Sequence, residues 1–187
     1  MALTHAAKSA TTNRVDDTSD SFIETLWKYG SDNHDMIRDE FITMFFGGFH
    51  TTSSLLSFAF NQIGRRPDIQ AKLQEEIDRV VEGDFVTMSE MRKLKYTRNI
   101  LHEILRYYTI TFYLLRVDHD SATKFHDGNE IPAGTSMILA LGKVLKDPNY
   151  WTNPDEFNPD RFNAPESKKP LVFSPFGFAG GRTCPGK

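Results

Sequence analysis

One cysteine, Cys184, is present among the 187 residues of the chain. A single thiol excludes an internal disulfide framework, and no cluster of cysteine and histidine has the spacing of a structural zinc site. A reducing compartment such as the cytosol fits this composition. A basic excess is missing too, since 22 Lys and Arg stand against 25 Asp and Glu, for a formal net charge of −3. This balance argues against nucleic acid as a partner.

Long apolar runs are scarce as well. Residues 1–20 are polar and lack the apolar core of a secretory signal, so we expect a disordered leader there. Residues 41–60 carry no Asp, Glu, Lys or Arg and are long enough for a membrane span. Their centre, GGFHTTSS, holds glycines, a histidine and hydroxyl groups, which are costly in lipid. A buried helix is therefore the structure we expect for this segment.

The residues that are present suit one globular domain of ordinary size, with 15 Phe, 6 Tyr and 2 Trp for its core or for a planar cofactor. Apolar periodicity predicts helices over about 21–29, 35–63, 67–83, 96–108 and 136–145. Strand signals occupy 112–117, and Asp127–Gly128 suits a hairpin turn. Five of the nine prolines lie in 153–175, which predicts an extended meander. The expected fold class is mainly α with a small β component.

Two of these helices carry clear local signals. Pro67 suits the first position of its helix, and the charged residues that follow on one side are expected on a solvated surface. Those charged residues are Glu75, Glu76 and Arg79. Thr87 and Glu90 have the spacing of a capping box, which predicts the start of a short helix.

Cys184 lies in a glycine-rich segment, with Gly180 and Gly186 on its two sides and Arg182 two residues before it. Glycines allow the backbone to approach a flat ligand closely, and an arginine stabilises a thiolate and also binds carboxylates. Together they suggest an axial thiolate ligand for heme iron, with Arg182 on a propionate. The alternative is a free cysteine that packs in a turn as a small hydrophobic residue.

Gly47 and Gly48 interrupt the helix expected over 35–63 and are followed closely by His50, Thr51 and Thr52. Each glycine inside a helix costs about 1 kcal/mol relative to alanine, so a pair of them indicates a close approach to the backbone. That approach could come from a ligand or from a packed helix, and both interpretations stay open.

Glu103 and Arg106 stand three residues apart on the helix expected over 96–108 and therefore share one face. On the surface such a pair contributes little to stability. Its neighbours Ile100 and Ile104 are apolar, so partial burial is the second interpretation.

The segment 173–187, FSPFGFAGGRTCPGK, resembles the heme-binding loop of the cytochrome P450 monooxygenases, F-x-x-G-x-R-x-C-x-G. The residues that match are Gly180, Arg182, Cys184 and Gly186. Gly177 stands where the phenylalanine is expected, between Phe176 and Phe178, so the loop is one residue longer than usual. The resemblance implies that Cys184 ligates the iron and that Phe176 belongs to the cofactor site.

Further motifs of the family follow one another in the family's order. In the central helix Gly48, Thr51 and Thr52 match, and His50 replaces the usual acid. The resemblance implies that Gly48 leaves room for oxygen, and that Thr51, with His50 at the acid position, helps to deliver protons.

Glu103 and Arg106 match the Glu-x-x-Arg pair of the family. The resemblance implies that Arg161, in FNPDRF, completes a buried triad with them, and that Arg116 is a second propionate-binding arginine.

The resemblance implies a heme-thiolate monooxygenase that contains heme (iron protoporphyrin IX) and inserts one oxygen atom of O2 into a small lipophilic substrate. Electrons would come from NADPH through a reductase. The parent protein would belong to the endoplasmic reticulum membrane, on the cytosolic face, through an N-terminal anchor absent from this chain. Residues 21–187 are interpreted as the C-terminal half of the catalytic domain, most similar to the animal family 20 group.

Two other functions stay open at this point. A non-catalytic heme sensor is favoured if His50 ligates iron, and a helical interaction module without cofactor is favoured if half of the heme pocket is absent. For the chain as given we expect weak heme binding or none.

Overall fold

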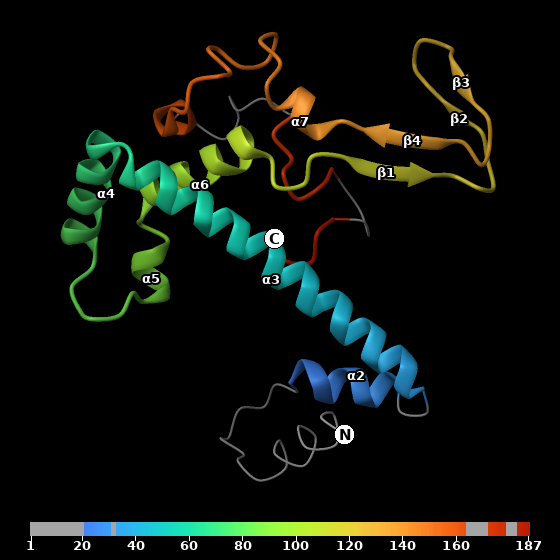
Figure 1. Cartoon of the computed structure of the whole chain (residues 1–187), viewed down its shortest axis with the longest axis horizontal. Coiled ribbons are helices and arrows are strands. Elements are labelled where there is room, and N and C mark those ends of the chain that lie inside the picture. Colours follow the sequence, from blue (N-terminus) through green and yellow to red (C-terminus); the bar gives the residue numbers. More distant parts are fainter. Residues whose placement is uncertain (1–20, 31–32, 164–171, 179–182) are drawn as a thin grey trace. The chain divides into compact units, whose positions relative to one another are not determined.

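The computed structural model describes residues 21–30, 33–163, 172–178 and 183–187, and Figure 1 shows their elements. The backbone divides into two compact units within one long helix, the first ending at His50 and the second beginning at Thr51. Within the described residues the chain is mainly helical, with two small antiparallel sheets. The fold class expected from the sequence is therefore confirmed.

The first unit contains helix α2, Phe22–Gly30, and the first half of helix α3, His34–Gly64. Ser21 and Glu24 cap α2 reciprocally, because the amide of each donates to the side chain of the other, at 2.8 and 3.2 Å. Asn33 caps α3 by accepting from the amide of Met36 at 3.0 Å. Side-chain oxygens at these positions satisfy amides that have no partner within the helix.

Residues 41–60 form the middle of α3, and the prediction that they are buried is wrong for this chain. Ala59 is the one buried residue among them, and Phe45, Phe46, Phe49 and Phe60 are each more than 60% exposed. Their apolar character identified a helix correctly, but burial depends on what packs around it. Among the residues that the structure describes, α3 included, no helix has the length and apolar character needed to cross a membrane.

In the second unit, α3 is followed by helices α4, Pro67–Val80, α5, Met88–Met91, and α6, Lys95–Tyr108. Pro67 begins α4 as its sequence predicted. The capping box of α5 is present as well, with the Thr87 side chain accepting from the Glu90 amide and the Glu90 carboxylate accepting from the Thr87 amide. Both starts are local features of the chain, which explains why periodicity and caps placed them well.

The sheets come next in the chain. Strand β1, Leu114–Val117, pairs with β4, Ser136–Leu139, and β2, Thr123–Lys124, pairs with β3, Glu130–Ile131; Figure 1 shows both pairs. The β2–β3 connection turns at Gly128, whose φ of 87° suits glycine, so the hairpin turn is confirmed.

The helix predicted over 136–145 is wrong in its first half. Residues 136–139 form strand β4, in register from Val117↔Ser136 to Leu114↔Leu139, and only Leu141–Val144 is helical, as α7. A short apolar run fits a strand or a helix equally well. The partner strand β1, about twenty residues earlier, decides between them.

The expected meander is only partly extended, because Pro159–Asn163 forms the short 3-10 helix η1, and residues 164–171 lie outside the described part. The core of the second unit has two clusters. One joins α3, α4, α6 and Phe157, and its buried members are Ala59, Ile69, Ile100, Ile104 and Phe157. The other joins Leu145, Trp151 and Phe162, with Val172 and Phe173 packed against them. Helix α6 thus lies between the helices and the meander.

Candidate functional site

A polar network surrounds Glu103 and Arg106 on α6, both of which are fully buried. Arg106 donates from Nε to Oε2 and from Nη2 to Oε1 of Glu103, both at 2.8 Å. This is a bidentate pair, the strong form of an arginine–carboxylate contact. Of the two interpretations that the sequence left open, the buried one is correct.

Arg106 also binds the backbone of the meander. Its Nη1 donates to the carbonyl oxygens of Leu145 at 3.1 Å and Pro154 at 2.8 Å, and its Nη2 donates to that of Glu156 at 3.1 Å. A buried guanidinium requires partners for its N–H groups, and here the chain 39 to 50 residues later supplies them.

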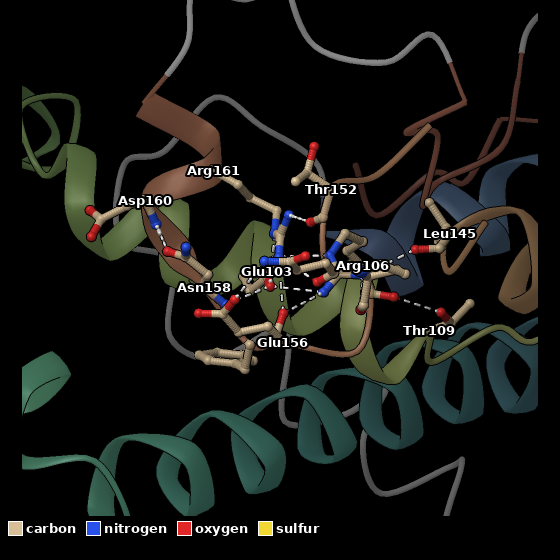
Figure 2. Close-up of polar contacts among 12 residues, drawn as sticks. Glu103, Arg106, Thr109, Leu145, Thr152, Glu156, Asn158, Asp160 and Arg161 are labelled. Carbon is tan, nitrogen blue, oxygen red and sulfur yellow. Dashed lines mark hydrogen bonds and ion pairs between the residues drawn. The ribbon is translucent and has the colours of Figure 1, made fainter. Parts of the chain in front are cut away.

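Arg161 on η1 completes the network from the other side, and Figure 2 shows the two arginines and Glu103 pointing toward one another. Its Nε donates to Glu103 Oε1 at 3.1 Å, and the Asn158 amide donates to the same oxygen at 2.8 Å. Its two terminal nitrogens donate to the carbonyl oxygens of Thr152, Asn153 and Glu156. The structure thus brings together all three residues of the expected triad, and the triad fastens the meander to α6.

Sequence reasoning missed Glu76, which was expected on a solvated surface. Its side chain is buried, and its carboxylate accepts from the amides of Tyr96 and Thr97 at 2.7 and 2.8 Å and from the Thr97 hydroxyl at 2.9 Å. Burial opposes ionisation of Glu76, but these hydrogen bonds outweigh it, and the pKa of the carboxyl is lowered. Glu76 therefore serves as the N-terminal cap of α6, the helix that carries Glu103 and Arg106.

A sequence signal for Glu76 did exist. Glu76 stands seven residues after the buried Ile69, which places both on the same side of α4. The first turn of α6 has no acidic residue of its own, and Leu94 at its N-cap provides no side-chain cap. A carboxylate on an apolar helix face needs hydrogen-bond donors, and an uncapped helix start has amides that need an acceptor, so each feature supplies what the other lacks.

Cys184 has an exposed thiol, and its amide donates to the Phe176 carbonyl at 2.8 Å. Gly177 has a φ of 96°, the left-handed region, and its amide donates to the Ser174 carbonyl at 3.0 Å. The cysteine is therefore held in a turn but is not packed as a buried residue. Gly180 and Arg182 lie outside the described residues.

The other predicted residues lie on α3 and β1. A Cβ built on Gly47 or Gly48 would meet nothing within 4 Å, so neither glycine is explained by close packing against another described helix. His50 stacks on Phe46, with ring centres 5.4 Å apart. Thr51, the next residue of α3, is exposed. Arg116, on β1, donates from Nη1 to the Leu115 carbonyl at 2.8 Å. Their roles toward a cofactor stay predictions.

Comparison with known proteins identifies the family. The family model for cytochrome P450 matches residues 4–187. The chain belongs to the cytochrome P450 family. The triad on α6 and η1 and the exposed cysteine therefore belong to a chain of the P450 family.

Individual P450 relatives cover most of the chain. Cytochrome P450 3A6 of Oryctolagus cuniculus is 36% identical over 163 residues, which are 83% of this chain and 32% of that protein. Cytochrome P450 4d2 of Drosophila melanogaster is 36% identical over 156 residues, 81% of this chain and 30% of that protein. Protein LUTEIN DEFICIENT 5, chloroplastic, of Arabidopsis thaliana is 31% identical over 174 residues, 89% of this chain and 28% of that protein.

The chain spans about a third of the length of the curated relatives it matches. None of these three relatives is described as an animal family 20 protein, so that assignment stays a prediction.

Heme is the cofactor that the P450 family implies, and the described residues fit it. A thiolate is a known axial ligand of heme iron, and Cys184 offers an exposed thiol. A Cβ on Gly186 would lie 3.7 Å from the Cys184 sulfur, an ordinary van der Waals contact, so Gly186 borders the thiol. No group of three or more His, Cys, Asp or Glu within the described residues suits a different metal.

Proposed function

We propose that the whole protein is a heme-thiolate monooxygenase in which Cys184 is the protein ligand of the iron. The observation that carries the proposal is the placement of this one thiol. It is exposed, it is held in a turn by the bond from its amide to the Phe176 carbonyl, and it follows a segment whose Phe173 ring contacts His102 of α6. A structural cysteine would be packed away from solvent, as free cysteines usually are.

Bound heme would supply the iron at which dioxygen is activated, so that one oxygen atom enters the substrate. The chain itself would bind and orient the cofactor. Cys184 would hold the iron as a thiolate, and Phe176, Gly180 and Gly186 would shape the backbone of the loop around it. Arg182 and Arg116 would bind the propionates, since a guanidinium matches a carboxylate in charge and shape.

On α3, three residues would serve the oxygen side of the site. Gly48 would leave room beside the helix, consistent with the open space around its Cα. The Thr51 hydroxyl and the His50 imidazole would hold and pass protons, as both groups can donate and accept.

The partners of the whole protein follow from the same proposal. They are a small lipophilic substrate, O2, and a reductase that passes on electrons from NADPH. The proposed location is the cytosolic face of the endoplasmic reticulum membrane, and no role with nucleic acid is proposed.

The test is the absorption spectrum of the reduced carbon monoxide complex of the full-length protein. We expect thiolate-type absorption in the wild type and in Lys187→Ala, which changes an exposed residue of the same loop. Cys184→Ser should abolish it while the helical circular dichroism is unchanged. Thiolate-type absorption that persists in Cys184→Ser would overturn the assignment.

The same spectrum separates the other two functions. A low-spin spectrum with two nitrogen ligands, lost in His50→Ala, would favour a heme sensor. Absence of heme from the purified wild type would favour an interaction module.

A further inference from the structure

Four aromatic side chains form a closed group next to the triad, which we call the ring cluster: His102, Trp151, Phe162 and Phe173. The His102 ring lies 5.3 Å from the Phe162 ring and 5.3 Å from the Phe173 ring, in both cases edge to face. Phe162 and Phe173 lie 4.9 Å apart, and the Trp151 ring is 5.9 and 6.0 Å from them. These separations are typical of attractive aromatic pairs.

Each ring of the cluster comes from a different segment. His102 belongs to α6, Trp151 to the loop after α7, Phe162 to η1, and Phe173 to the segment that leads to Cys184. Trp151 and Phe162 are each 4% exposed, so their rings contact protein and not solvent. The cluster therefore joins α6 to three successive segments that lie 49 to 71 residues later in the chain.

The ring cluster is tied to the triad. His102 directly precedes Glu103 on α6, and the guanidinium carbon of Arg106 lies 5.4 Å from the centre of the Trp151 ring. Arg106 also binds the carbonyl of Leu145, whose side chain packs with Trp151 and Phe162. Movement of either group would disturb the other.

The ring cluster is also tied to the cysteine. Phe173 stands three residues before Phe176, whose carbonyl accepts the hydrogen bond from the Cys184 amide at 2.8 Å. The turn between them is closed by the bond from the Gly177 amide to the Ser174 carbonyl. A short chain of contacts thus leads from α6 through His102 and Phe173 to the thiol.

We propose that His102 and Phe173 are positioning residues for Cys184, because their ring contact fixes the segment 172–178 against α6. The proposal rests on the proposed role of Cys184 as iron ligand, which requires the thiol at one fixed place. The triad alone does not provide this, because within the described residues its side-chain hydrogen bonds reach Leu145 and residues 152–158 but no residue of 172–178 or 183–187. The ring cluster is the connection from that rigid network to the loop.

Hydrogen exchange at the Cys184 amide, in the full-length protein, measures how firmly the loop is held. Phe173→Ala and His102→Ala each remove ring contacts, so we expect this amide to exchange about tenfold faster in both. Exchange of the α6 amides should stay within about twofold of wild type, which shows that the effect is local. Phe178→Ala is the matched control, because Phe178 lies on the same segment but is 54% exposed.

A conservative variant distinguishes ring packing from mere loss of volume. His102→Phe keeps an aromatic ring at the centre of the two edge contacts and should restore slow exchange at Cys184. Exchange in Phe173→Ala or His102→Ala no faster than in Phe178→Ala would overturn the proposal, as would fast exchange in His102→Phe. All of these variants keep Cys184, so the exchange rates can contradict the proposal while the carbon monoxide spectrum still shows a thiolate ligand.

Discussion

Replacing Arg106 by alanine removes the centre of the polar network. In the folded protein its side chain is fully buried and donates two hydrogen bonds to Glu103 and three to the carbonyl oxygens of Leu145, Pro154 and Glu156. Without it, Glu103 stays buried with Arg161 and the Asn158 amide as its remaining partners. The carbonyl oxygens of Leu145 and Pro154 lose this donor, while that of Glu156 keeps the bond from Arg161 Nη2 at 2.9 Å.

The expected cost is about 3–5 kcal/mol, the range for breaking a buried ion pair by removing one partner. Arg161 keeps 3.1 Å contact with Glu103, which limits the loss, while the unpaired carbonyls increase it. Since a domain of this size is stable by only about 5–15 kcal/mol, the change is a large share of the total.

The measurement is the free energy of unfolding from urea titration, followed by helical circular dichroism and by tryptophan fluorescence. Arg38→Ala is the matched control, because Arg38 forms ion pairs with Asp35 and Asp39 at 2.8 and 2.9 Å but is half exposed. It should cost less than about 1 kcal/mol. A loss in Arg106→Ala as small as in Arg38→Ala would show that the network does not hold the fold.

Three further changes test separate parts of the chain. The pKa of the Glu76 carboxyl is lowered in the folded state. Its hydrogen bonds therefore stabilise the fold at pH values above the ordinary glutamate pKa of 4.5, and this stabilisation is lost as pH falls through the folded pKa. Glu76→Gln should therefore lower the free energy of unfolding most near neutral pH. If this loss does not become smaller in acid, Glu76 does not stabilise the fold as an ionised cap of α6. Thr87→Ala removes the capping box of α5 and should cost about 1 kcal/mol in urea titration, whereas Met88→Ala, at an exposed position, should cost less. In the full-length protein, His50→Asp should raise the product formed per NADPH consumed and His50→Ala should not, because an aspartate restores the acid of the family; equal ratios in wild type and His50→Asp would contradict this.

Much of the fold was accessible from the sequence because it depends on neighbours along the chain. The capping box at Thr87, the proline at the start of α4, the hairpin turn at Gly128 and the long helix around the two glycines are all specified within a few residues. The family motifs around Glu103 and Cys184 are likewise local patterns, and they led to the P450 family before any geometry was considered.

Tertiary structure decided the points that depend on remote partners. Ser136–Leu139 is a strand because β1 pairs with it, and Glu76 is buried because the start of α6 offers it donors twenty residues later. Most of residues 41–60 are exposed because burial depends on packing partners, which helical periodicity does not specify. The sequence alone predicted which residues bind heme and named the members of the triad. Only the fold determined that Arg106 reaches three carbonyls and that His102 meets Phe173, since hydrogen bonds and ring contacts between remote segments form only after the chain has folded.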